Sequence, residues 1–393
     1  MIPNYYEFLN SVKILSGKKA LENIPYELKY LGAKRPIILA DKMLVKVGLV
    51  DHLLNAFKGS DIVIGALYAD IPQDSSVKVV NEIAEVYRSQ ECDSIIAIGG
   101  GSVIDTAKGL NIVISEETDD LLKVMGAEIL TKKQQPFIAI PTTSGTGSEA
   151  TLVAVIADKD RNVKMEFTSY RILPDVAVLD PRMTVSLPVN MTAATGMDAL
   201  VHAIESYTSI QKNPLSDAYA FAAINLIREY LPKVIENGKD EEGRLAMANA
   251  SLMAGAAFSN AMVGVIHAIG HALGGVSRVP HGVAMSILLP FGIEFNMDKL
   301  AYAYGELLLP IAGAEIYAST KAEERPRKAV EAIRIMTKNL KEKAGLPLNL
   351  SEVGVKKEDF EQIAKTALND GALIFNAKEV TYEDIIDILE KAY

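Results

Sequence analysis

Along roughly the first half of the chain, short apolar runs alternate with stretches in which apolar residues recur at helical spacing. The apolar runs predict buried strands over residues 36–40, 62–68, 94–98, 137–140 and 173–179. Helical spacing over residues 77–88 and 102–113 separates several of them. Strands that alternate with helices indicate a parallel sheet with helices on both faces. We therefore expect a Rossmann-like α/β fold in this half.

The pattern changes in the middle of the chain. Two alternating segments, residues 152–157 and 163–168, flank the polar turn 158–162 and predict a hairpin. Beyond Pro181 the chain is rich in Ala, Leu, Met and Ile at helical spacing. This spacing predicts helices over residues 192–209, 214–235, 241–262, 264–276 and 282–297, with several more towards the C-terminus. No strand pattern of comparable strength occurs there, so this half is expected to be all-helical.

The chain length agrees with this division, because 393 residues amount to two or three typical domains. We expect an α/β nucleotide-binding domain over residues 1–185 and an all-helical domain over residues 186–393. The boundary should lie near residues 182–190, where Pro181 and Pro188 interrupt the pattern.

Composition excludes several classes of protein. Hydrophobic residues make up 49% and charged residues 23% of the chain, which is typical of a globular protein. No apolar run approaches the ~20 residues of a membrane span, and the N-terminus lacks a signal-peptide pattern, so a cytoplasmic location is expected. The net charge is −10 without a Lys/Arg stripe, so nucleic acid is not an expected partner. Because Cys92 is the sole cysteine, an internal disulfide and a cysteine-rich metal site are both excluded.

A run of three glycines, residues 99–101, follows a predicted strand and opens a predicted helix. Glycine lets the backbone approach a diphosphate, and the helix start offers free N–H groups to it. Ser102 is expected to cap this helix, with Asp105 in a position like that of a capping box. Ile104 stands where the usual dinucleotide fingerprint has its third glycine, so a tight turn without a ligand is the alternative.

Two further features suit a nucleotide. The segment 142–149, Thr-Thr-Ser-Gly-Thr-Gly-Ser-Glu, places five hydroxyl side chains and two glycines after a buried strand. Such a loop can bind phosphate, ribose or an amide through backbone and hydroxyl donors. Asp41 ends the first predicted strand, where an acid can accept hydrogen bonds from a ribose and repel a 2′-phosphate. The alternatives are an ordinary solvent loop and a helix-capping aspartate.

Four of the five histidines lie in the helical half, in apolar surroundings. Asp198 and His202 are four residues apart, as are His267 and His271, so each pair shares one helix face. His281 opens another apolar helix. Buried carboxylates and imidazoles are costly unless they are paired or bind a metal, and such a donor set suits Fe(II) or Zn(II). Spacing alone leaves these five groups as candidate ligands, and satisfied core histidines are the alternative.

Taken together, the motifs resemble those of the iron-containing (group III) alcohol dehydrogenases. The resemblance is carried, in the order of that family, by Gly-Gly-Gly-Ser-Val-Ile-Asp at 99–105, Pro-Thr-Thr-Ser-Gly-Thr-Gly-Ser-Glu at 141–149, Gly-Met-Asp-Ala-Leu-Val-His at 196–202, His-Ala-Ile-Gly-His-Ala-Leu-Gly at 267–274 and Pro-His-Gly-Val-Ala at 280–284. It implies an NAD-binding α/β domain and an all-helical metal domain, the architecture of dehydroquinate synthase, with the active site in the cleft between them. It also implies a homodimer or larger oligomer.

The activity implied is that of an NAD-dependent alcohol dehydrogenase or aldehyde reductase acting on a small primary alcohol or diol. One divalent metal, Fe(II) in first place and Zn(II) in second, assists the hydride transfer. The resemblance assigns the metal ligands to Asp198, His202, His267 and His281, and a role in proton transfer near the nicotinamide to His271. It assigns cofactor contacts to Asp41, Gly99, Gly100, Gly101, Ser102, Asp105, Thr142, Thr143, Thr146 and Lys164. Asp198, His267 and His271 are then the residues expected to act in catalysis.

Departures from the family pattern concern the substrate side more than the chemistry. Residues 376–378 read Asn-Ala-Lys where many relatives have Asn-Pro-Arg, and Val153 replaces a polar residue of some diol-handling relatives. One alternative is a lyase similar to dehydroquinate synthase, although its arrangement of basic substrate residues is not evident. A non-catalytic nucleotide- or metal-binding protein is another. Variants similar to glycerol dehydrogenase or maleylacetate reductase are weaker alternatives, since all four ligand positions are filled.

Overall fold

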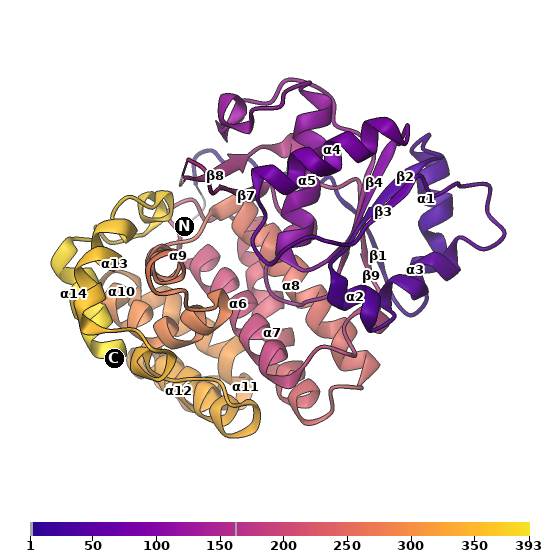
Figure 1. Cartoon of the computed structure of the whole chain (residues 1–393). Coiled ribbons are helices and arrows are strands. Elements are labelled where there is room, and N and C mark those ends of the chain that lie inside the picture. The colour runs from indigo at the N-terminus through magenta and orange to yellow at the C-terminus, as the bar shows by residue number, and fades with distance from the viewer. Residues whose placement is uncertain (1–2, 162) are drawn as a thin grey trace. The chain divides into compact units, whose positions relative to one another are not determined.

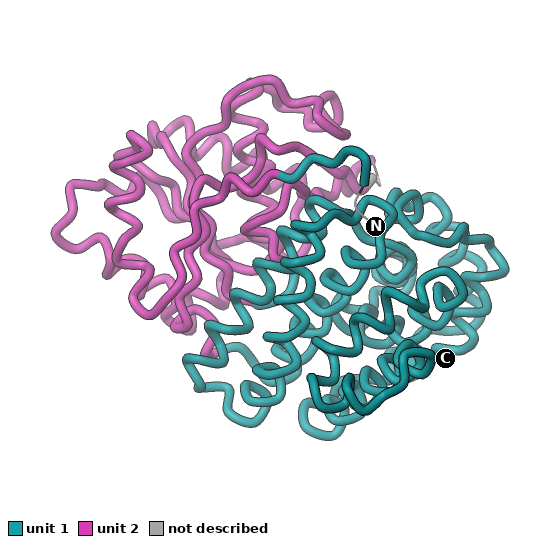
Figure 2. Tube along the Cα trace, turned by 180° about the vertical axis from the view of Figure 1, so that it is seen from behind, with its two compact units in different colours: residues 1–8, 144–146, 187–393 teal, residues 9–143, 147–186 magenta. Residues whose placement is uncertain are grey.

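A computed structural model of the protein (Figure 1) describes residues 3–161 and 163–393. The chain divides into two compact units, which are coloured separately in Figure 2. Residues 9–143 and 147–186 form the α/β unit, and residues 1–8, 144–146 and 187–393 form the helical unit. The main change of unit therefore falls between Ser186 and Leu187, while two short segments from the N-terminal half belong to the helical unit.

The α/β unit contains a six-stranded sheet in which every neighbouring pair is parallel, as the strand–helix alternation predicts. The strands, in spatial order, are β1 (Lys13–Ser16), β9 (Val176–Leu179), β6 (Phe137–Pro141), β4 (Ser94–Gly99), β2 (Pro36–Leu39) and β3 (Ala66–Tyr68). The predicted second strand is shorter than expected, because it begins only at Ala66. β1 was not predicted, since three of its four side chains are exposed and leave no apolar run.

Helices cover both faces of this sheet, which explains the nearly continuous apolar character of its central strands. On one face lie α4 (Val77–Ser89) and α5 (Gly101–Ser115), and on the other lie α1 (Ile24–Tyr30), α2 (Lys42–Lys46) and α3 (Leu49–Ala56) (Figure 1). Successive residues of β4 point to opposite faces: Ile95 and Ala97 join the core under α4 and α5, whereas Ile96 and Ile98 join the core under α1 and α3.

A smaller sheet completes the α/β unit. Its strand order is β5 (Gly126–Ala127), β8 (Val163–Thr168) and β7 (Val153–Asp158). β7 and β8 pair antiparallel, with Val153 opposite Thr168, so the predicted hairpin is confirmed.

The helical unit has no strand among residues 187–393, all of which the structure describes. Its helices are α6 (Val189–Thr208), α7 (Pro214–Glu236), α8 (Glu241–Ala261), α9 (Val265–Ser277), α10 (His281–Ala312), α11 (Ala314–Ser319), α12 (Arg325–Ala344), α13 (Phe360–Ala367) and α14 (Tyr382–Ala392). The helix predicted over 282–297 continues as far as Ala312 through a break at Leu300, whose backbone is not helical. α6 packs against α7, α8 and α10 and is buried along most of its length, so its polar side chains lie inside the unit.

Candidate metal centre and nucleotide loops

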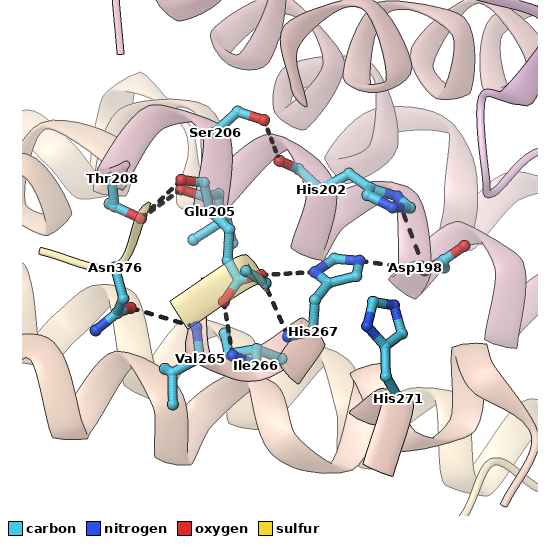
Figure 3. Close-up of polar contacts among 12 residues, drawn as sticks. Asp198, His202, Glu205, Ser206, Thr208, Val265, Ile266, His267, His271 and Asn376 are labelled. Atoms are coloured by element: carbon cyan, nitrogen blue, oxygen red, sulfur yellow. Dashed lines mark hydrogen bonds and ion pairs between the residues drawn. The ribbon is translucent and has the colours of Figure 1, made fainter. Parts of the chain in front are cut away.

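Four of the five candidate ligands gather at one point of the helical unit. Figure 3 labels three of these four, Asp198, His202 and His267. Asp198 and His202 come from α6, His267 from the first turn of α9, and His281 is the first residue of α10. One ligand atom from each lies within 4.8 Å of the others. Asp198 Oδ1 is 3.2 Å from His281 Nε2, 3.8 Å from His202 Nδ1 and 4.0 Å from His267 Nε2. Two atoms bonded to one ion at about 2.0–2.2 Å lie at most about 4.4 Å apart, so the four atoms are close to the spacing that a single ion requires.

The protonation of this cluster suits a cation. Burial lowers the pKa of His202 to about 3, and burial followed by the charges of His281 and His271 holds the pKa of His267 well below its usual value. Both imidazoles are therefore neutral and keep a lone pair. Burial alone would raise the pKa of Asp198, but His202, His281 and His267 together hold it well below its ordinary value, so the group is a carboxylate.

Two of the candidate ligand atoms make no hydrogen bond within the described part of the chain. His202 Nδ1 and His267 Nε2 are buried there without a hydrogen-bond partner. Leaving a buried polar atom unsatisfied costs about 1–3 kcal/mol, so such atoms are uncommon without a function. One carboxylate and three imidazoles match the preference of Fe(II) or Zn(II), and the donor set fits a divalent metal with an open position.

His271 does not join this cluster, although it lies one turn after His267. Its side chain is 47% exposed, and its Nδ1 lies 2.8 Å from Asp370 Oδ2. Its ring stacks on that of His281, with centroids 5.4 Å apart and planes 16° apart. The structure thus separates His271 from the four grouped candidate ligands, whereas sequence spacing alone left all five groups as candidates.

Glu205 is a residue that the sequence analysis missed. It lies on α6, and its side chain accepts a hydrogen bond from the backbone N–H of Ile266 at 2.7 Å and lies 2.6 Å from His267 Nδ1 (Figure 3). Burial raises the pKa of Glu205 to about 7. Asp198, His202 and Glu205 are spaced i, i+4, i+7, so they share one helix face, and this spacing was the available signal.

In the α/β unit, the two glycine-containing turns meet at the carboxyl ends of neighbouring strands. Gly99 of β4 pairs with Pro141 of β6, and the backbone N–H of Thr142 donates to the Gly99 carbonyl at 3.0 Å. A Cβ on Gly100 would lie 3.3 Å from Thr143 Oγ1, so the two turns approach each other closely and a larger residue would displace the Thr143 side chain.

Asp41 follows β2, the neighbour of β4 on its other side. From β2 the chain moves outward to β3, whereas from β4 it moves the opposite way to β6. The carboxyl ends of β2 and β4 therefore flank a topological switch point, where open α/β sheets bind their ligands. Asp41 Oδ1 also accepts from the backbone N–H of Leu44 at 2.9 Å and caps α2, so the capping role is present as well.

The expected capping box on α5 is wrong. α5 begins at Gly101 and its N-cap is Gly100, so Ser102 lies too far into the helix to cap it. The hydroxyl of Ser102 donates to the Gln73 carbonyl instead. Asp105 accepts from Ser148 Oγ at 2.7 Å and from the backbone N–H of Val155 at 3.1 Å, so it ties α5 to the segment after the hydroxyl-rich loop.

A second missed residue, Lys108, strengthens the same connection. Its side chain is fully buried, and Nζ donates to the carbonyls of Thr151 and Val153 at 2.7 and 2.8 Å. Burial lowers the pKa of Lys108 to about 8. Of two other predicted cofactor residues, Thr146 lies in the part of the hydroxyl-rich loop that groups with the helical unit, and Lys164 is exposed on β8 of the smaller sheet.

Among the described residues, none of the helices combines the length and apolar character needed to cross a membrane. A parallel α/β unit with two nucleotide-type turns, joined in one chain to a helical unit with an Asp-His₃ cluster, is typical of a metal-dependent dehydrogenase. The family described as "Iron-containing alcohol dehydrogenase" matches residues 11–181, and "Fe-containing alcohol dehydrogenase family, C-terminal" matches residues 192–393. The protein belongs to the iron-containing alcohol dehydrogenase family.

Individual relatives agree over nearly the whole chain. It is 36% identical over 376 residues to the NAD-dependent methanol dehydrogenase of Bacillus methanolicus, a match that covers 96% of this chain and 97% of that protein. It is 35% identical over 387 residues to the NADPH-dependent butanol dehydrogenase of Clostridium saccharobutylicum, covering 97% and 96%. The crystal structure of a 1,3-propanediol oxidoreductase superposes with a TM-score of 0.94 at 34% identity, covering 99% of this chain and 100% of that one. The family favours a dehydrogenase over the lyase and non-catalytic alternatives.

Proposed function

We propose that this protein is an NAD-dependent alcohol dehydrogenase or aldehyde reductase that uses one divalent metal and acts on a small primary alcohol or diol. The observation that carries the proposal is the grouping of Asp198, His202, His267 and His281, which leaves two buried imidazole nitrogens without another partner in the described chain. In this proposal the helical unit is the metal-binding catalytic domain and the α/β unit is the NAD-binding domain.

The four grouped side chains hold the metal, with Fe(II) as the first candidate and Zn(II) as the second. When bound, the metal supplies a Lewis acid that polarises the substrate oxygen, while NAD carries the hydride. His271 contributes the proton transfer: its Nδ1–H donates to Asp370, so its Nε2 is free to accept a proton. Because the side chain of His271 is half-exposed, that proton can pass on to water.

NAD binding is assigned to the edge of the sheet where the two turns meet. The backbone of residues 99–101 and the hydroxyls of Thr142 and Thr143 suit the diphosphate, next to the N-terminus of α5. One relative uses NAD and another uses NADPH at nearly equal identity, so overall similarity does not choose between the cofactors. The choice of NAD rests on the carboxylate of Asp41, which disfavours a 2′-phosphate. Ser102, Asp105, Thr146 and Lys164 remain assigned to the cofactor site, Asp105 through its bond to Ser148.

A cytoplasmic homo-oligomer is part of the proposal. A sole cysteine that forms no disulfide suits a reducing compartment. The sheet has two open edges, β1 and β3, on which Ile14 and Leu67 are exposed, and an open apolar edge can pair with a second copy. Light scattering on the purified protein measures the oligomer directly, and a monomer would remove this part of the proposal.

The experiment that tests the function compares His267→Ala with His52→Ala. Each variant loses one imidazole, but His52 is exposed on α3 in the α/β unit. Proteins are stripped of metal, reconstituted separately with Fe(II) and Zn(II), and assayed for NADH formation with a panel of primary alcohols and diols. We expect the wild type and His52→Ala to bind one metal and turn over, and His267→Ala to do neither. Full activity of a metal-free His267→Ala protein would refute the proposal.

A further inference from the structure

The start of α9 is held by two side chains from distant parts of the helical unit, the buried Glu205 and the half-buried Asn376. Glu205 accepts the backbone N–H of Ile266 at 2.7 Å and, at a longer 3.4 Å, that of His267. The amide oxygen of Asn376 accepts the backbone N–H of Val265 at 3.3 Å. Only Glu205 also reaches the imidazole of His267, whose Nδ1 lies 2.6 Å from its Oε2.

This contact determines which nitrogen of His267 carries the proton. The two oxygens of Glu205 each face a backbone N–H group, that of Ile266 at Oε1 and that of His267 at Oε2. A group placed among donors in this way acts as an acceptor, so Nδ1 of His267 is the donor in its contact with Oε2. A neutral imidazole has one N–H, so Nε2 is left with its lone pair. Nε2 is also the atom that faces Asp198 Oδ1 in the cluster of four ligands. The hydrogen bond therefore presents the ligand atom in its metal-binding form.

Glu205 also fixes the position of that ligand relative to two others. It shares a face of α6 with Asp198 and His202, and it bonds the first turn of α9, which carries His267. A Cβ at Gly264, the residue before α9, would lie 3.3 Å from Glu205 Oε1, so the backbone approaches the carboxylate closely. One carboxylate thus connects the helix that supplies two ligands to the helix that supplies the third.

We propose that Glu205 is the positioning residue of the metal centre, which holds His267 as its Nδ1–H tautomer and thereby sets the affinity for the metal. This inference rests on the proposed function, because it assumes that His267 Nε2 is a ligand. Carboxylates bonded to a ligating imidazole typically change metal affinity about 10–100-fold when they are removed.

Glu205→Gln is the decisive variant because it preserves the size of the side chain. Ile266 N–H and His267 Nδ1 face different oxygens of Glu205. A glutamine amide has one oxygen and one NH₂ group, so in this position it presents an acceptor to only one of the two. If its NH₂ faces His267, the imidazole proton must move to Nε2, where it blocks the metal. If its oxygen faces His267 instead, two donors oppose each other at Ile266.

Two matched variants separate this effect from others. Asn376→Ala removes the other side chain that caps α9, without touching the imidazole. Glu27→Gln neutralises a different buried acid, which is 3% exposed and bonds Lys13 in the α/β unit. Co(II) affinity of the full-length, metal-stripped proteins is measured against a competing chelator. We expect Glu205→Gln to weaken Co(II) binding about 10–100-fold and both controls to bind like the wild type.

A second measurement needs no variant of Glu205. In metal-free wild-type protein labelled with ¹⁵N-histidine, the resonances missing from His267→Ala identify His267, and we expect them to report the Nδ1–H tautomer. An Nε2–H tautomer, unchanged Co(II) affinity in Glu205→Gln, or an equal loss in Asn376→Ala would each overturn the inference. If His267→Ala itself binds Co(II) as tightly as the wild type, the proposed metal centre fails instead.

Discussion

His271 Nδ1 and Asp370 Oδ2 lie 2.8 Å apart, and they connect α9 to the start of the 3₁₀ helix Gly371–Phe375. Asp370 Oδ1 accepts the backbone N–H of Ala372 at 2.9 Å, so one carboxylate caps that helix and orients the imidazole. Burial would raise the pKa of Asp370, but the hydrogen bond and charge of His271 bring it below its usual value. In the proposed mechanism, this contact leaves Nε2 of His271 as the nitrogen that exchanges a proton.

Asp370→Asn tests this role of the pair. Asparagine can still cap the helix, but it lacks the charge that stabilises a protonated His271. We expect kcat for a primary alcohol to fall about tenfold or more, with little change in KM; loss of all proton-transfer catalysis would typically cost about 10²–10⁴-fold. Steady-state kinetics at saturating NAD give both constants, and Co(II) affinity serves as the control. An unchanged kcat would assign His271 and Asp370 a purely structural role.

Much of this molecule is predictable from the sequence, because local periodicity and burial agree along most of it. The strands over 94–98 and 137–140 are apolar on both faces and pack under helices on both sides. The helix over 192–209 is nearly coincident with α6. Where the two signals disagree, the prediction fails: β1 has mostly exposed side chains, so only its pairing with β9 reveals it as a strand.

The site is predictable where scarce residues repeat at helical spacing, and unpredictable where burial decides the role. Five histidines are few enough to stand out, whereas Glu205 and Lys108 belong to common residue types that usually face solvent. Both side chains are buried in the tertiary structure, where Glu205 contacts His267 of α9 and Lys108 contacts Thr151. His271 is a case in which helical spacing is misleading, because its spacing from His267 does not bring it into the cluster.

The cofactor preference yields a prediction at Asp41. Asp41→Asn removes the charge and keeps an acceptor for the backbone N–H of Leu44, so α2 stays capped. Without the charge, the repulsion of a 2′-phosphate is lost. A change of about 1.4 kcal/mol in binding free energy corresponds to a tenfold change in affinity. We expect the ratio of kcat/KM for NADP to that for NAD to rise about tenfold. An unchanged ratio, or a wild type that prefers NADPH, would contradict the role of Asp41.

The position of His281 depends on close packing between α10 and α6. A Cβ on Gly282 would lie 2.4 Å from the backbone oxygen of Ala194 on α6, and this contact cannot relax by moving a side chain. Gly282→Ala should therefore displace the start of α10, lower the free energy of unfolding by about 1–3 kcal/mol and weaken Co(II) binding.

Gly275→Ala is the matched control for this variant. Gly275 lies on α9, and a Cβ there meets nothing within 4 Å. We expect it to raise the free energy of unfolding by about 0.4–1 kcal/mol and to leave Co(II) affinity unchanged. If Gly282→Ala binds Co(II) as well as Gly275→Ala does, the packing at Gly282 does not position the ligand.

The last prediction concerns acid stability and rests on Arg182, which bonds two carboxylates in the α/β unit. Its guanidinium contacts Asp180 at 2.7 and 2.9 Å and Glu22 at 2.7 and 3.0 Å. Burial would raise the pKa of Asp180, but the hydrogen bonds and charge of Arg182 bring it below its usual 3.8. The hydrogen bond of Arg182 likewise lowers the pKa of Glu22 below 4.5.

An acid whose pKa is lower in the folded state stabilises the fold above its unfolded pKa, and this contribution is lost as the pH falls through the folded value. Arg182→Gln should therefore lower the free energy of unfolding by about 2 kcal/mol at pH 7, less than for a fully buried pair because Arg182 is partly exposed. The difference between wild type and variant should shrink below about pH 4.

Urea unfolding of the full chain at several pH values, followed by circular dichroism, measures this difference. Arg161→Gln is the matched control, because the pair of Arg161 with Asp120 is 49% and 32% exposed and should contribute less than about 1 kcal/mol at any pH. A difference between wild type and Arg182→Gln that stays the same from pH 7 to below pH 4 would contradict the lowered pKa values. If the two arginine variants lose the same free energy of unfolding, burial of Asp180 does not strengthen its ion pair with Arg182.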